Sequence, residues 1–132
     1  QLPGDTAVWD AEGYISIRGR TDDMIITGAE NVHPVVVEEA IKDHPGVIDV
    51  FVTGAPSKRW GEAIVAYIAL KDPNLKEEDF VEFCKNHPRL ARYQRPKYYK
   101  FVDFKELPFN PSGKKMHFVI KERAKKDFPD LD

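Results

Sequence analysis

The chain has 132 residues, of which 42% are hydrophobic and 32% are charged, and its 20 basic and 22 acidic side chains give a formal net charge of −2. This length suits one domain, or one domain with a tail, and the apolar fraction is sufficient for a packed core. No run of about 18 apolar residues occurs, which excludes a membrane-spanning helix, and a single cysteine excludes an internal disulfide and favours a reducing compartment, which we take to be the cytoplasm.

The chain alternates between short strand-like and helix-like stretches. Runs rich in β-branched and aromatic residues predict strands, whereas a proline at a first position or an i, i+3, i+4, i+7 apolar face predicts a helix. In chain order, the predicted strands are a β-hairpin over 7–18 with its turn at Gly13, short strands at Met24–Thr27 and Asn31–His33, two central strands at Val47–Thr53 and Ala63–Leu70 joined by a polar loop over 56–62, and a strand at Tyr98–Asp103. The predicted helices are Pro34–Asp43, Lys76–His87 and Met116–Lys126, with a loop over 108–113 before the last one.

The order of these elements predicts the fold class α/β (α+β). We expect a small mixed sheet of about three strands, flanked by helices and preceded by the β-hairpin. Cys84 lies on the apolar face of the helix at 76–87 with Phe80 and Phe83, so we interpret it as a small core residue.

Charge is distributed unevenly along the chain. Residues 1–50 contain ten acidic and three basic side chains, so the rest of the chain has a net positive charge, much of it between residues 89 and 100. A basic half suits a phosphate-bearing ligand, although a run of charge is also typical of a solvated surface. A nucleic-acid partner is not expected, because the whole chain is acidic and no recognition motif occurs in that stretch.

Two segments combine charged side chains with glycine. The first is Gly19–Gly28 (GRTDDMIITG), which by itself fits a capped turn with an arginine–carboxylate pair, and the second is Ser112–Lys114, which by itself fits a surface lysine. Other chemistry is not indicated: the four histidines and Cys84 lack ligand spacing, so no transition-metal site is expected, and neither a P-loop nor a nucleophile elbow occurs.

Together and about 90 residues apart, the two segments resemble motifs of the adenylate-forming (AMP-binding) superfamily, which includes acyl-CoA synthetases, aryl-CoA ligases, luciferases and peptide-synthetase adenylation domains. The stretch GRTDDMIITGAENVHP at 19–34 is similar to the hinge motif of that family. The stretch LPFNPSGK at 107–114 is similar to its C-terminal lysine motif, and Gly4-Asp5 resembles the end of its preceding nucleotide motif.

The resemblance implies that the chain is the C-terminal cap domain of an acyl- or aryl-CoA synthetase, an AMP-forming acid–thiol ligase. Members adenylate a carboxylic acid with ATP and Mg²⁺ and transfer the acyl group to a thiol, while the small domain rotates between the two steps. Residues 1–22 would be the end of the N-terminal adenylation domain and the hinge, and residues 23–132 the cap. The implied partners are that adenylation domain, a fatty or aryl acid and coenzyme A, with Mg²⁺ held mainly by the other domain. We therefore expect a piece of a longer polypeptide that is inactive alone.

The resemblance also implies roles for individual residues. Lys114 matches the lysine that reaches the carboxylate, ribose and α-phosphate, where a point positive charge stabilises the meeting of two anions. Asp22 matches the hinge, whose backbone dihedrals absorb the rotation. Asp5 and Arg20 match nucleotide-binding positions. The matched coenzyme A positions are Gly28, Trp60, Tyr93, Arg95 and Lys97, where the aromatics would flank adenine and the cations would meet phosphates.

Some positions depart from the family pattern. Ala29 stands where many members have a second glycine, and His117 stands where an arginine is often found after the lysine; Pro3 and Val36 also differ. Two alternatives stay open. Within the family, the acyl acceptor could be a carrier-protein thiol or oxygen instead of coenzyme A; outside it, the chain could be a docking module without chemistry. Trp60 with Arg95 and Lys97 favours coenzyme A.

Overall fold

The computed structural model describes residues 23–129 and 131. Its strands are β1 (Ile25–Thr27), β2 (Glu30–Val32), β3 (Val47–Ser57), β4 (Gly61–Leu70) and β5 (Tyr98–Phe101). Its helices are α1 (Pro34–Lys42), α2 (Glu77–Asn86) and α3 (His117–Asp127), with short 3₁₀ turns η2 (Arg92–Gln94) and η3 (Phe104–Glu106). The predicted hairpin over 7–18 lies outside the described residues, and the later elements agree with the sequence prediction in type and order.

The sheet is mixed and has five strands. The antiparallel pair β3–β4 forms its centre, and β5 runs parallel to β4 from the Val65–Tyr98 pair to the Ile68–Phe101 pair. β1 joins β4 through the single pair Thr27–Gly61, and β2 pairs with β1. The predicted fold class is confirmed, but the expectation of about three strands was too low, because the three-residue strands β1 and β2 extend the same sheet beyond the end of β5.

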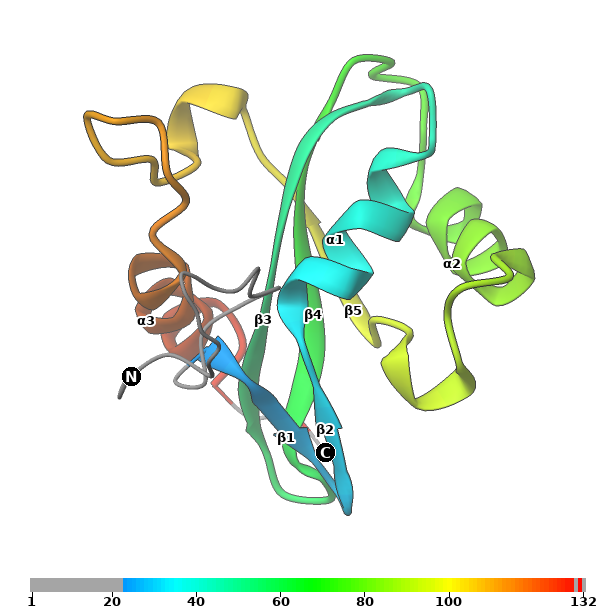
Figure 1. Cartoon of the computed structure of the whole chain (residues 1–132), viewed down its shortest axis with the longest axis vertical. Coiled ribbons are helices and arrows are strands. Elements are labelled where there is room, and N and C mark those ends of the chain that lie inside the picture. Colours follow the sequence, from blue (N-terminus) through cyan, green and yellow to red (C-terminus); the bar gives the residue numbers. More distant parts are fainter. Residues whose placement is uncertain (1–22, 130, 132) are drawn as a thin grey trace, which may run out of the picture.

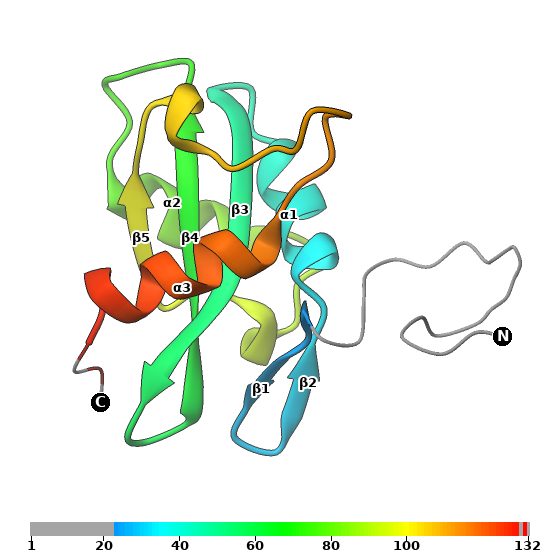
Figure 2. The same cartoon turned by 90° about the vertical axis from the view of Figure 1, so that its left-hand side faces the viewer.

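Helices cover both faces of this sheet, with α1 and α2 on one face and α3 on the other (Figures 1 and 2). Alternate residues of β3 separate into two cores, as the period-2 geometry of a strand requires: Val50 and Val52 pack toward α1 and α2, and Phe51 packs toward α3. Burial on both faces explains why the central strands are almost continuously apolar.

Cys84 is 1% exposed in the core beneath α2, and burial raises the pKa of its thiol, which confirms the prediction of a packing role. None of the helices in the described part of the chain is long and apolar enough to cross a membrane.

The connection between the central strands is tighter than predicted. β3 continues to Ser57 and β4 begins at Gly61, so most of the predicted polar loop belongs to the strands. The Ser57 hydroxyl accepts a hydrogen bond from the Trp60 N–H at 3.1 Å, and Gly61 supplies the left-handed backbone (φ +81°) that closes the turn. As a result, Trp60 stands at the tip of the β3–β4 hairpin, beside the β1–β2 turn.

Candidate functional site

The loop that carries Lys114 joins η3 to α3 and projects from one end of the domain (Figures 1 and 2, orange). Asn110 organises it: its side-chain oxygen accepts hydrogen bonds from the N–H groups of Ser112 and Lys114, both at 2.9 Å. The Asn110 N–H donates to the Lys114 carbonyl at 2.8 Å. Gly113 adopts φ +86°, which an asparagine-closed turn of this kind assigns to glycine. The loop backbone is therefore well defined although its side chains are exposed.

Lys114 and Lys115 differ sharply in environment. The Lys114 side chain is exposed and makes no ion pair or hydrogen bond with any residue in the part of the chain that the structure describes. The Lys115 ammonium lies 3.2 Å from Glu38 Oε1 and 3.0 Å from Asp49 Oδ1, with a side chain that is 21% exposed. Lys114 is therefore the lysine of this loop that is available to an external anion.

A second candidate site lies around the tip of the β3–β4 hairpin. It is a pocket of about 420 Å³ lined by the β1–β2 turn (residues 27–30), Trp60, Arg92, Tyr93 and Lys97. Four of the five residues predicted to bind coenzyme A, namely Gly28, Trp60, Tyr93 and Lys97, thus line one cavity although they span 70 positions of the sequence.

Gly28 and Trp60 form the floor of this pocket. The Gly28 N–H donates to the Trp60 carbonyl at 2.7 Å, and Gly28 adopts φ +61°. A Cβ atom at position 28 would lie 3.4 Å from Trp60 Cε3, in van der Waals contact with the indole ring, and the left-handed backbone would be strained by any side chain there.

Positive charge gathers around the indole ring. Lys97 Nζ lies 4.8 Å and the Arg59 guanidinium carbon 5.2 Å from the ring centroid, both within cation–π range. The Lys97 backbone is held in place because its N–H donates to the Ile64 carbonyl of β4 at 2.8 Å. Tyr93 is 44% exposed, so its ring is accessible from the pocket side. An aromatic platform flanked by cationic side chains suits a ligand that combines a planar base with phosphates.

Arg95 is placed differently from the other predicted residues. It is absent from the pocket lining, and its Nη2 donates to the Lys85 carbonyl at the end of α2 at 3.4 Å. Arg92 and Glu30 line the pocket instead, and the sequence reasoning did not select them. The available signal was that Arg92 is a cation directly beside Tyr93, in a short segment bounded by Pro88 and Pro96. Asp5, Arg20 and Asp22 lie outside the described residues.

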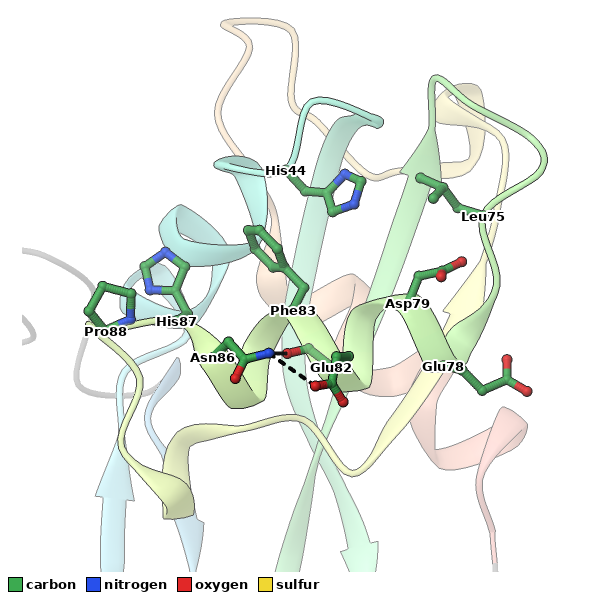
Figure 3. Close-up of a pocket in the computed structure, with 9 residues that line it drawn as sticks. All are labelled: His44, Leu75, Glu78, Asp79, Glu82, Phe83, Asn86, His87 and Pro88. Atoms are coloured by element: carbon green, nitrogen blue, oxygen red, sulfur yellow. Dashed lines mark hydrogen bonds between the residues drawn. The ribbon is translucent and has the colours of Figure 1, made fainter.

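Another groove lies along α2 and is lined by Phe83 and the acidic residues Glu78, Asp79 and Glu82, with His44 and His87 beside them (Figure 3). Several of its polar groups are engaged within the fold. Asn86 Nδ2 donates to the Glu82 carbonyl at 3.0 Å and to the Glu82 side chain at 3.1 Å, as the dashed lines in Figure 3 mark, and the His44 Nδ1 accepts from the Gly46 N–H at 3.0 Å. At about 480 Å³ it is similar in size to the pocket at Trp60. Its three carboxylates disfavour a phosphate ligand, so the two cavities differ as candidate phosphate-binding sites in their charge and not in their volume.

The Lys114 loop and the pocket at Trp60 lie at opposite ends of the long axis of the domain, because the β1–β2 turn that lines the pocket points away from the orange loop in both views (Figures 1 and 2). One orientation of the domain cannot direct both sites at the same external point.

Comparisons with known proteins identify the family of this domain. The family model for the AMP-binding enzyme C-terminal domain matches residues 36–114. The long-chain-fatty-acid–CoA ligase FadD13 of Mycobacterium tuberculosis is 40% identical over 126 residues, which cover 96% of this chain and 24% of that protein. The peroxisomal trans-cinnamate:CoA ligase of Petunia hybrida is 40% identical over 125 residues, covering 94% of this chain and 21% of that protein.

Solved structures give the same result. A fatty acyl CoA synthetase of Mycobacterium tuberculosis superposes with a TM-score of 0.78 at 40% identity, over 89% of this chain and 23% of that one. ATP-bound MatB from Rhodopseudomonas palustris superposes with a TM-score of 0.78 at 33% identity, over 90% of this chain and 23% of that one. The chain thus spans about a quarter of the length of these relatives. It belongs to the family of AMP-binding enzyme C-terminal domains and is homologous to the C-terminal region of acyl- and aryl-CoA ligases.

Proposed function

We propose that this chain is the C-terminal cap of an ATP-dependent acid–thiol ligase that converts a fatty or aryl carboxylic acid to its coenzyme A thioester. The single observation that carries the proposal is the arrangement of two sites on one domain: a free ammonium at one end and a cationic aromatic pocket at the other. Each site suits one half of a two-step reaction.

In the first step, a carboxylate oxygen attacks the α-phosphorus of ATP and pyrophosphate leaves. Two anions approach each other in the transition state, so a positive charge at that point lowers the barrier. Lys114 is exposed on a well-defined loop, which supports its assignment to this role. Asp5 and Arg20 are proposed to contact the nucleotide, and Mg²⁺ is proposed to be held mainly by the adenylation domain.

In the second step, the coenzyme A sulfur attacks the acyl carbonyl and AMP leaves. The pocket at Trp60 would bind the nucleotide end of coenzyme A, with adenine on Trp60 and Tyr93 and with the phosphates near Lys97. Gly28 is proposed to leave room for the pantetheine arm. A nucleotide-sized cationic pocket favours coenzyme A over a carrier protein, whose pantetheine carries no adenine.

The two steps would need two orientations of the domain, since the two sites lie at opposite ends (Figure 2). We propose that the cap rotates on an N-terminal adenylation domain of the same polypeptide, with Asp22 as the hinge residue whose backbone dihedrals change. The role of Asp22 would be torsional rather than acid–base.

The lysine assignment is tested with Lys114→Ala in a protein that carries the adenylation domain. ATP–pyrophosphate exchange should fall on the order of a hundredfold to a thousandfold, whereas thioester formation from preformed acyl-adenylate should be retained. Lys126→Ala, an exposed lysine at the end of α3, is the matched control. If both half-reactions of Lys114→Ala equal those of the parent protein, the chain acts as a docking module without chemistry.

The pocket is tested by comparing Arg92→Ala, Arg95→Ala and Lys97→Ala. Variants of residues that contact coenzyme A should raise its KM and leave ATP–pyrophosphate exchange unchanged. From the pocket lining, we expect a larger effect for Arg92 and Lys97 than for Arg95. An unchanged KM for coenzyme A in all three variants would count against the placement of its nucleotide in this pocket.

A further inference from the structure

The outer side of β3 is closed by side chains rather than by another strand. In the described part of the chain, β3 pairs along its length only with β4, apart from the bridge of Ser57 to Leu131 at its end. The Val50 N–H donates to Asp49 Oδ1 and the Val52 N–H donates to Glu38 Oε2, both at 2.8 Å. The Lys115 ammonium donates to the Val50 carbonyl. These backbone N–H and C=O groups, which would lack hydrogen-bond partners at the edge of a sheet, are thus paired with side chains.

These side chains form one ionic cluster, which we call the β3-edge cluster: Glu38, Asp49, Lys115 and His117. Glu38, whose side chain is 5% exposed, also accepts a hydrogen bond of 2.7 Å from His117 Nε2. The Lys115 ammonium is shared between the carboxylates of Glu38 and Asp49 and lies 4.8 Å from the centroid of the Phe51 ring. Because the charges are partly or fully removed from water, loss of one member leaves its partners uncompensated.

The cluster surrounds the base of the Lys114 loop. Lys115 follows Lys114 directly and closes the loop through its β-bridge to Phe109. His117 begins α3, and its Nδ1 lies 3.9 Å from Asp23 Oδ2. Asp23 in turn is the next residue after Asp22, the proposed hinge. The loop base is therefore tied to α1, to the edge of β3 and to the segment that leads to the hinge.

We propose that Glu38, Lys115 and His117 are positioning residues for adenylation, which hold the Lys114 loop on the edge of β3 so that its ammonium is presented in one orientation. This inference rests on the proposed function of Lys114. The cluster would act through the loop and not by contact with substrate, because its charges are directed inward. A displacement of about 1 Å of a reacting group costs on the order of a hundredfold in rate, so a loosened loop base should be visible in the kinetics.

The test uses Glu38→Gln and Lys115→Met in a protein that carries the adenylation domain, with the two half-reactions measured separately. ATP–pyrophosphate exchange should fall by roughly tenfold to a hundredfold, with thioester formation from preformed acyl-adenylate unchanged, and Lys115→Arg should recover part of the loss. Glu38→Gln is nearly isosteric and keeps an acceptor for the Val52 N–H, so the fold is expected to persist.

Arg123→Met is the matched control. Arg123 also lies over a buried aromatic ring, at 5.2 Å from the Tyr67 centroid, and pairs with two carboxylates, Glu106 and Asp127, but it lies farther along α3 from the loop. Its loss should lower the stability of the domain and leave the ratio of the two half-reaction rates unchanged.

Hydrogen exchange of the amides at residues 109–116 gives a readout that does not depend on catalysis. It should accelerate in the Glu38 and Lys115 variants and not in Arg123→Met. Equal losses in both half-reactions, or unchanged loop exchange, would overturn the positioning role. Lys114→Ala, measured in parallel, separates the two ideas: if it lowers adenylation selectively and the cluster variants do not, only the positioning role fails, and if it has no effect, the proposed function itself fails.

Discussion

At the scale of single residues, the adjacent side chains of Lys114 and Lys115 are chemically identical, but their different surroundings in the fold give them different roles. Lys115 exchanges hydration for two carboxylates and a carbonyl, so its ammonium is committed to the fold. Lys114 keeps its hydration and its freedom of orientation, so it can be desolvated by a ligand instead. A charge that the fold already neutralises has little left to offer a transition state.

Asp43 provides a pH-dependent test of an ion pair at the surface. Hydrogen bonds from His87 and Arg89 lower the pKa of the Asp43 carboxyl in the folded state. Since the unfolded carboxyl titrates near about 3.9, this contribution to stability is fully present above that pH and is lost as the pH falls through the folded pKa. Asp43→Asn should therefore reduce the free energy of unfolding at pH 7, and the difference from the parent should shrink below about pH 4.

Urea denaturation followed at several pH values checks this expectation. Asp72→Asn is the control, because the Asp72 carboxylate accepts from the Asn74 N–H at 3.0 Å, a bond that an asparagine oxygen retains. A difference between Asp43→Asn and the parent that stays constant down to pH 2.5 would contradict the assignment.

At the scale of elements, α3 is fastened to the sheet at both of its ends. Its start carries His117 of the β3-edge cluster, and its last residue, Asp127, accepts a hydrogen bond of 2.8 Å from the hydroxyl of buried Tyr67 on β4. Burial, and then the carboxylate of Asp127, raise the pKa of Tyr67, so the hydroxyl remains a donor at neutral pH. The C-terminal end of the helix that follows the Lys114 loop is thus held independently of that loop.

Removal of the Tyr67 hydroxyl measures this attachment. Tyr67→Phe should lower the free energy of unfolding by about 1 kcal/mol, the usual net value of one hydrogen bond, as measured by urea denaturation. Tyr98→Phe is the matched control, since the Tyr98 ring also packs near the end of α3, at 5.9 Å from Phe128, and its hydroxyl has no hydrogen bond within residues 23–129 and 131. Equal losses in the two variants would show that the Tyr67–Asp127 bond contributes nothing.

At the scale of the whole molecule, the two sites occupy opposite ends of a single domain (Figure 1). Each offers a positive group to an anion, and neither forms a cavity for the acid to be activated within the described residues. We therefore expect residues 1–132 alone to be inactive in ATP–pyrophosphate exchange with a panel of fatty and aryl acids. Mixing with a separately produced adenylation domain is the complementary measurement. Exchange by the isolated chain above the no-enzyme background would contradict the need for a second domain.

Much of the fold could be predicted from the sequence, because its signals are local. Pro34 starts α1 where the first-turn preference of proline places a helix start, and the apolar face of Phe80 and Cys84 marks α2. The membership of β1 and β2 in the sheet could not be predicted in the same way. It depends on one pairing between Thr27 and Gly61, which the packing of distant segments creates.

The candidate site, like the fold, could be predicted from the sequence only in part. The glycine–lysine loop and the set Gly28, Trp60, Tyr93 and Lys97 were predicted through the resemblance to family motifs, and the structure gathers those four residues in one pocket. That Arg92 and not Arg95 lines the pocket depends on where each side chain points in and just after η2, which residue spacing does not specify.

By itself, the sequence determined the order of the elements, the family and the lysine loop, because these depend on residues close together in the chain. Only the tertiary structure decided that Lys115 is neutralised while Lys114 is free, since the Lys115–Glu38 contact joins positions 77 residues apart. The opposite placement of the two sites was also a tertiary result. The physical reason is common to both: burial and charge pairing depend on which surfaces meet when helices pack on a sheet.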